Sequence, residues 1–150
     1  MLKEKIYADV KDAMRAKEKE KLGVLRLITA AIKQIEVDER IDVDDARILV
    51  ILDKMTKQRK ESIAQFTAAS RHDLVKQEEY ELSIISQYMP EPLSEGEIAQ
   101  LVAEAIHLID AKKIADMGRV MAHLKPLAQG RADMNKISQL VKDKLTLLQP

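Results

Sequence analysis

The chain has 150 residues, which is the size of one typical domain or of two small ones that share a core. Hydrophobic residues make up 46% of it, which argues against a disordered chain, and charged residues make up 33%, which argues against a membrane protein. The absence of cysteine excludes disulfides, thiolate metal sites and a cysteine nucleophile. Lys plus Arg and Asp plus Glu balance at 25 each, so bulk charge does not predict nucleic-acid binding.

The composition indicates an all-α protein. There are only four Gly and four Pro to build turns, and the apolar residues are mostly Leu, Ile, Ala, Val and Met, which favour helices. No apolar run approaches the roughly 20 residues of a transmembrane span, and we see no signal peptide at the N-terminus. We therefore expect no membrane contact, and the lack of cysteine fits a reducing, cytoplasmic location.

Two helices are predicted at the start of the chain. The first covers residues 2–17 and ends in a solvated elbow of alternating charge at residues 17–21. The second is clearer, because its apolar residues recur from Val24 to Ile35 at the spacing of one helical face. Asp42 then follows as the predicted N-cap of a third helix.

The third helix should be long, with one apolar stripe that the polar residues 57–62 interrupt. A fourth helix follows residues 71–74 and ends at Pro90 and Pro92, since neither proline can donate to a helix ladder. These prolines form the best candidate boundary in the chain. We therefore predict an N-terminal subdomain of four helices over residues 1–90.

Three further helices are predicted beyond this boundary. A capping box that opens at Ser94 starts the cleanest amphipathic helix of the chain. Asp116 can cap a short helix that Pro126 should kink or end, and Asp133 caps the last helix. Residues 91–150 are therefore predicted to form a C-terminal three-helix tail subdomain.

No catalytic centre is visible in the sequence. There is no phosphate-binding glycine loop and no Gly-x-Ser-x-Gly motif. Glu104 and His107 form one Glu-x-x-His pair, whereas a di-metal bundle needs two such pairs and two more glutamates. Glu78, Glu79 and Glu81 are interpreted as a solvated face or as partners of nearby cations. We expect no catalytic residue, no metal and no cofactor.

Two groups of basic residues are candidate phosphate-binding sites. The stronger RNA-binding candidate is the set of cations that flank the turns around Gly130, namely Arg119, Lys125, Arg131 and Lys136. These turns lie at helix ends, where backbone N–H groups also favour anions, and Gly130 permits close approach. A secondary basic ridge on the third helix consists of Lys54, Lys57 and Lys60. The spacing of the ridge alone favours a solvated face.

Several short motifs occur in order along nearly the whole chain. They are Leu25-Arg26, Lys57-x-Arg59-Lys60-Glu61-Ser62, Arg71-x-Asp73-Leu74, Glu78 with Glu81, Tyr88-Met89-Pro90, Met117-Gly118-Arg119-Val120-Met121 and Gly130-Arg131-Ala132-Asp133. None of them is diagnostic alone. As an ordered set they resemble the YqeY family.

The resemblance implies an N-terminal helical subdomain followed by a three-helix tail. The family is similar to the C-terminal helical and tail region of the B subunit of the tRNA-dependent amidotransferase. That enzyme converts Glu-tRNA(Gln) to Gln-tRNA(Gln), or Asp-tRNA(Asn) to Asn-tRNA(Asn), and there the module helps to hold tRNA. The family-level label is accordingly a carbon–nitrogen ligase with glutamine as amido-N-donor.

We therefore expect a tRNA-binding or tRNA-positioning module related to tRNA-dependent amidotransferases. We do not expect it to be catalytic alone, because the chain offers no site for ATP, an activated carboxylate or an ammonia source. An aminoacyl-tRNA synthetase or amidotransferase subunits are the expected protein partners. The alternative is an all-helical adaptor that docks on such a partner, which the neutral charge and scarce aromatics favour. A helix-turn-helix DNA binder built on residues 116–145 is a third and weaker hypothesis.

Overall fold

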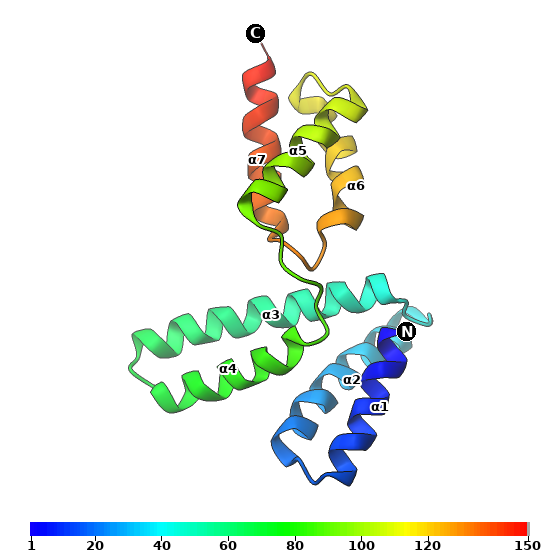
Figure 1. Ribbon diagram of the computed structural model, residues 1–150, viewed down its shortest axis with the longest axis vertical. Helices are drawn as coiled ribbons and strands as arrows, with labels where there is room; N and C mark the ends of the chain where they lie inside the picture. Colours follow the sequence, from blue (N-terminus) through cyan, green and yellow to red (C-terminus); the bar gives the residue numbers. More distant parts are fainter. Residues whose placement is uncertain (150) are drawn as a thin grey trace. The chain divides into compact units, whose positions relative to one another are not determined.

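The computed structural model describes residues 1–149, and every regular element within them is helical, which confirms the all-α prediction (Figure 1). The α-helices are α1 (Leu2–Arg15), α2 (Lys19–Glu39), α3 (Asp45–Ala68), α4 (His72–Ser86), α5 (Glu95–Ile109), α6 (Met117–Ala128) and α7 (Met134–Leu148). A 3₁₀ turn, Ile114–Asp116, precedes α6.

The chain divides into two compact units, each with its own hydrophobic core. Unit 1 covers Met1–Met89, and unit 2 begins at Pro90. Helix α4 ends at Ser86, four residues before Pro90, which has no N–H to donate the hydrogen bond that a further helical turn would need. That residues 1–90 and 91–150 fold independently remains a prediction.

Unit 1 consists of two antiparallel helical hairpins (Figure 1). Helix α1 pairs with α2 and α3 pairs with α4, while α2 also packs on α4. Each helix is apolar along one stripe only, so all four contribute to a shared core. The buried core residues are Ile6, Ala13, Val24, Leu25, Ile28, Ile32, Val43, Ile48, Ile51, Leu52, Met55, Ile84, Ile85 and Tyr88.

In unit 2, helices α5, α6 and α7 pack against one another. The predicted capping box at the start of α5 is confirmed, because the Ser94 hydroxyl accepts from the Glu97 amide at 3.1 Å and the Glu97 carboxylate accepts from the Ser94 amide at 3.2 Å. The buried core residues are Val102, Ala105, Ala111, Val120, Leu124, Ala128, Ile137, Val141 and Leu145.

The predicted N-cap of α3 is wrong by two residues. Asp44 caps this helix, since its carboxylate accepts a hydrogen bond from the Arg47 amide at 2.9 Å. Asp42 lies outside the helix and binds Lys3 instead, at 2.7 Å. The reason is tertiary, because the loop residue Val43 is buried in the core and holds the loop extended before the first helical turn.

Pro126 was predicted to kink or end α6, and it does not end the helix. The helix continues through this proline to Ala128. Pro126 falls in the last turn, where the carbonyl left without a donor belongs to the exposed residue Ala122. Solvent can satisfy such a carbonyl, so the helix runs on until the Gly130 turn.

Tyr88 ties the end of α4 to α1. Its side chain is only 4% exposed, and its hydroxyl donates to Oδ2 of Asp9 at 2.6 Å. Burial and this bond to Asp9 both raise the pKa of Tyr88 well above the usual tyrosine range. The ammonium of Lys5 lies 5.7 Å from the centre of the ring, within the range of a cation–π contact. The last residues before the proline boundary are therefore anchored to unit 1.

A fragment of residues 1–89 should fold by itself, because the core of unit 1 contains residues of all four of its helices and none from beyond Met89. We expect a far-ultraviolet circular dichroism spectrum of a helical protein and a cooperative thermal transition. A fragment that loses its helical signal would contradict the boundary at Pro90.

Tyr88→Phe should lower the free energy of unfolding by about 1.5–3 kcal/mol, the usual effect of losing a hydrogen bond to a charged group. Chemical denaturation of the full chain measures this change. Tyr7→Phe is the matched control, since Tyr7 is 37% exposed and should change stability by less than about 0.5 kcal/mol. Equal effects of the two substitutions would show that the Tyr88–Asp9 bond contributes nothing.

Candidate nucleic-acid interface

The turn between α6 and α7, which we call the Gly130 turn (residues 129–133), is the centre of the stronger predicted site. Gly130 has a φ of 78°, a left-handed conformation that glycine adopts without strain. The amides of Arg131 and Ala132 both donate to the Ala128 carbonyl, at 2.9 and 3.1 Å, and close the turn. Asp133 then caps α7 by accepting from the Asn135 amide at 2.9 Å. The chain's own carboxylate therefore already lies where an anion would bind this helix end.

Arg131 has a structural role that its sequence position did not reveal. Its Nε donates to the carbonyl of Glu91 at 2.9 Å, and its own carbonyl accepts from the Leu93 amide at 2.8 Å. These two bonds hold the segment before α5 against the Gly130 turn. The arginine is half-buried in this position, so part of its donor capacity is already used within unit 2.

A shallow hollow of about 240 Å³ lies next to Arg131, and its polar lining is mostly acidic or neutral. It is lined by Leu93, Glu97, Gln100, Leu101, Glu104 and Arg131. The pKa of Glu97 lies below its usual range, chiefly because the Ser94 amide donates to it, with a smaller contribution from Arg131. An ionised Glu97 and Glu104 beside the guanidinium disfavour a phosphate at this side of Arg131.

Lys125 and Lys136 are the two lysines of the predicted set around the Gly130 turn. Lys125 lies in the last turn of α6 and Lys136 in the first turn of α7, so the Gly130 turn connects them. Both side chains are exposed. Neither forms an ion pair with any residue in the described part of the chain, and their charges are available to a ligand.

Arg119 does not belong with these lysines. It lies in the first turn of α6, about 9 Å along the helix axis from Lys125 and about 120° around it. Its guanidinium pairs with Asp116 at 3.1 Å, although its side chain remains 64% exposed. The carboxylate of Asp116 also accepts from the amides of Lys112 and Lys113, which together with Arg119 lower its pKa. Arg119 thus helps to close the turn before α6.

The three lysines of the secondary basic ridge on α3 do not form one continuous basic face. Lys54 and Lys60 are exposed, whereas Lys57 pairs with Asp53 at 3.6 Å. Lys60 follows Lys54 by six positions, so their side chains diverge by about 120° around the helix. Arg59 is no part of the ridge, because its side chain is only 14% exposed and pairs with Glu81 of α4.

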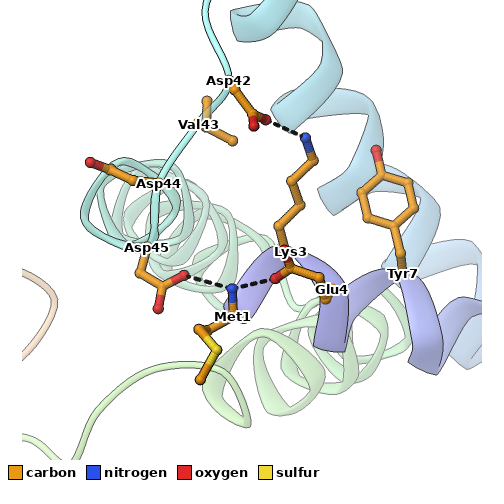
Figure 2. A pocket seen from close by; sticks show the side chains of 8 residues that line it. All are labelled: Met1, Lys3, Glu4, Tyr7, Asp42, Val43, Asp44 and Asp45. Carbon is orange, nitrogen blue, oxygen red and sulfur yellow. Dashed lines mark hydrogen bonds and ion pairs between the residues drawn. The ribbon is translucent and has the colours of Figure 1, made fainter.

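A larger hollow, of about 640 Å³, lies where the N-terminus of α1 meets the loop before α3 (Figure 2). It is lined by Met1, Lys3, Glu4, Tyr7, Asp42, Val43, Asp44 and Asp45. Sequence reasoning missed it, because the acidic loop was interpreted only as the start of a helix. The signal that could have found it is the density of carboxylates over residues 42–45.

The cations in this hollow are neutralised by the chain itself. The Lys3 ammonium lies 2.7 Å from Asp42 (Figure 2). It also lies 2.6 Å from Glu36, and the bonds to Asp42 and Glu36 raise its pKa. The amine of Met1 contacts Glu4 and lies 3.6 Å from Asp45. With four carboxylates at its lining, the hollow is acidic overall and does not suit a nucleic-acid phosphate.

Two further properties bear on the kind of site the chain can hold. Among residues 1–149, no group of three or more His, Asp or Glu side chains is arranged to hold a metal ion. None of the described helices combines the length and apolar character needed to cross a lipid bilayer.

Comparison with known proteins identifies similar sequences over most of the chain. A family model described as Yqey-like protein matches residues 3–145. A protein of Pyrenophora tritici-repentis named "Altered inheritance of mitochondria protein 41, mitochondrial" is 33% identical over 93% of this chain and 78% of its own length. A protein of the same name from Saccharomyces cerevisiae is 38% identical over 58% of its own length. The one from Eremothecium gossypii is 39% identical over 45% of its own length.

The names of these relatives contradict the cytoplasmic location expected from the sequence, since all three are described as mitochondrial. That expectation was wrong because it rested on composition. A chain without cysteine is compatible with any compartment and reports nothing about an address.

Proposed function

The chain belongs to the Yqey-like family, and on this basis we propose that it is a tRNA-binding or tRNA-positioning module related to tRNA-dependent amidotransferases. The observation that carries the proposal is the pair of exposed lysines, Lys125 and Lys136, on either side of the Gly130 turn. Ammonium groups without an internal carboxylate partner are the usual contacts to a phosphate backbone.

Position, and not scarcity of cations, favours this placement. Some cations of unit 1, such as Lys3 and Arg47, pair with carboxylates, but many other lysines are exposed and form no ion pair in the described chain. Lys125 and Lys136 are distinguished by lying on either side of one turn between two helix ends. The contact surface we propose is small and positions RNA through its backbone, without reading its bases.

The module is proposed to act without catalysis of its own. Amide transfer needs a phosphate-binding site for ATP, an activated carboxylate and an ammonia source. The two hollows described above are lined mainly by carboxylates and apolar side chains, and neither offers an arrangement that suits a triphosphate. The family-level label of carbon–nitrogen ligase with glutamine as amido-N-donor would then describe the larger assemblies in which related modules occur.

A protein-interaction adaptor is the second candidate function, and exposed apolar side chains favour it. Leu147 is 84% exposed and Leu108 69% exposed in unit 2, and Val37 is 64% exposed in unit 1. A synthetase or amidotransferase subunit would be the partner. The two candidates differ in their response to salt, because apolar contacts are not weakened by counterions.

Lys125→Glu and Lys136→Glu should each weaken binding of labelled total tRNA and reduce the slope of log affinity against log salt by about 1, since each removes a phosphate contact. Fluorescence anisotropy at several salt concentrations, with duplex DNA as a comparison ligand, measures both quantities. Arg119→Glu should have a smaller effect, because this arginine already pairs with Asp116.

Lys144→Glu is the matched control for this experiment. It makes the same change of net charge on the exposed surface of α7, about 12 Å along the helix from Lys136. Equal loss from all three lysine variants would mean that only bulk charge matters. Salt-insensitive behaviour, or no binding of the wild-type chain to tRNA at low salt, would contradict the proposal and favour the adaptor.

The purified chain should not amidate Glu-tRNA(Gln) when it is supplied with ATP and glutamine. The reaction is followed by separating glutaminyl from glutamyl product after deacylation. Addition of complete amidotransferase serves as the positive control. Turnover by the chain alone would contradict a module without catalysis of its own.

A further inference from the structure

Helices α3 and α4 face each other along a line that we call the α3–α4 seam. Halfway along this seam, apolar side chains are replaced by charged ones. Ile48, Leu52 and Met55 follow the spacing of one helical stripe, and the next member of that stripe is Arg59. On α4 the same spacing leads back from Ile85 to Glu81 and then to Glu78. The sequence stretch that interrupts the apolar pattern of α3 therefore faces two carboxylates of α4. We call Arg59, Glu78 and Glu81 the polar layer of the seam.

The polar layer is incompletely bonded. Nε of Arg59 lies 3.5 Å from Glu81, and the two side chains are 14% and 15% exposed. Another nitrogen of the guanidinium donates weakly to the Met55 carbonyl at 3.4 Å. Nε of Arg59 and Oγ1 of the neighbouring Thr56 are buried without a hydrogen-bond partner in the described chain. Buried polar groups of this kind stabilise a helix pair less than apolar side chains of similar size.

Glu78 adds a second carboxylate to one guanidinium. Burial raises the pKa of Glu78 and repulsion from Glu81 raises it further, while Arg59 offsets part of the effect. The layer thus has one cation between two acids, and one of these acids is held in an environment that disfavours its charge.

Beyond the polar layer the hairpin has little packing. Between Thr56 and Ser83 no side chain falls among the buried residues. The large apolar residues between Lys60 and Glu79, namely Ile63, Phe66, Leu74 and Val75, are all only half-buried. Tyr80, which follows them on α4, packs against the core of unit 1 and lies outside this stretch. The core of unit 1 instead uses the stretches of α3 and α4 that lie nearer Met55 and Ile84.

The geometry points to residues 60–79 as an arm that opens separately from the rest of unit 1, and the Arg59–Glu81 pair of the polar layer marks the boundary at which opening stops. Local opening occurs where few apolar contacts would be lost, and its free energy lies below that of global unfolding. The arm meets this condition along its whole length. The segments on the other side of the layer, which contain fully buried Leu52 and Ile85, do not.

Native-state hydrogen exchange of the full chain, read by mass spectrometry, tests this inference directly. Amides of residues 60–79 should be protected at least about tenfold less than helical amides of residues 24–32 and 48–55. The boundary in α3 should fall close to Arg59. The proposal would be overturned if protection were uniform along α3 and equal to that of α2.

Two variants test the role of the polar layer. Glu81→Gln leaves Arg59 without its partner and should lower protection of residues 60–79 by about a further tenfold while residues 24–32 are unaffected. Glu79→Gln is the matched control, because it makes the same chemical change at an exposed position of the same helix. The double variant Arg59→Met with Glu81→Met should raise protection of the arm above that of the wild type. An equal loss of protection throughout unit 1 in Glu81→Gln, or a less protected arm in the double variant, would overturn the assignment.

Discussion

Every helix of this chain is apolar along a single stripe, and each unit must cover those stripes with only three or four helices. In unit 1 this constraint makes Leu25, Ile28 and Ile32 of α2 central, because side chains from α1, α3 and α4 join them in one core. Unit 2 meets the same constraint with Val120, Leu124 and Val141. Nearly all fully buried side chains are aliphatic, which suits close packing between helices without polar atoms that would need partners.

The distribution of charge follows from the same constraint. Since so little polar surface is buried, most charged residues lie outside, and many form pairs that close helix ends or loops. Lys3 between Glu36 and Asp42 and Arg119 beside Asp116 are examples. Such exposed pairs contribute little stability individually, but they remove cations from the surface available to an anionic ligand. Lys125 and Lys136 differ from them in having no such partner in the described chain.

The chain belongs to the Yqey-like family, and its relatives are named for an effect on mitochondria. The names describe inheritance of an organelle and no reaction. The proposal of a tRNA-binding module therefore rests on the resemblance of the ordered motifs and on the lysines at the Gly130 turn. The arm formed by the outer part of α3 and α4 is a separate feature, and it lies in the other unit.

Much of this molecule was determined by local sequence. The helix content, the order of four helices before Pro90 and three after it, and the caps at Ser94 and Asp133 could all be predicted, because propensity, periodicity and capping act over a few residues. The cap of α3 could not, since burial of Val43 moved it from Asp42 to Asp44.

Local sequence also failed to predict which cations of the candidate sites are available to a ligand. Sequence spacing placed Arg131 and Arg119 with two lysines, and Arg59 is next to Lys60 of the ridge in the sequence. Only the tertiary structure decided that Arg131 bonds to the carbonyl of Glu91, that Arg119 lies at the far end of α6, and that Arg59 faces Glu81 within a helix seam. The physical reason is that a cation's availability depends on which carboxylate or carbonyl lies within about 4 Å of it, and that partner is often distant in sequence.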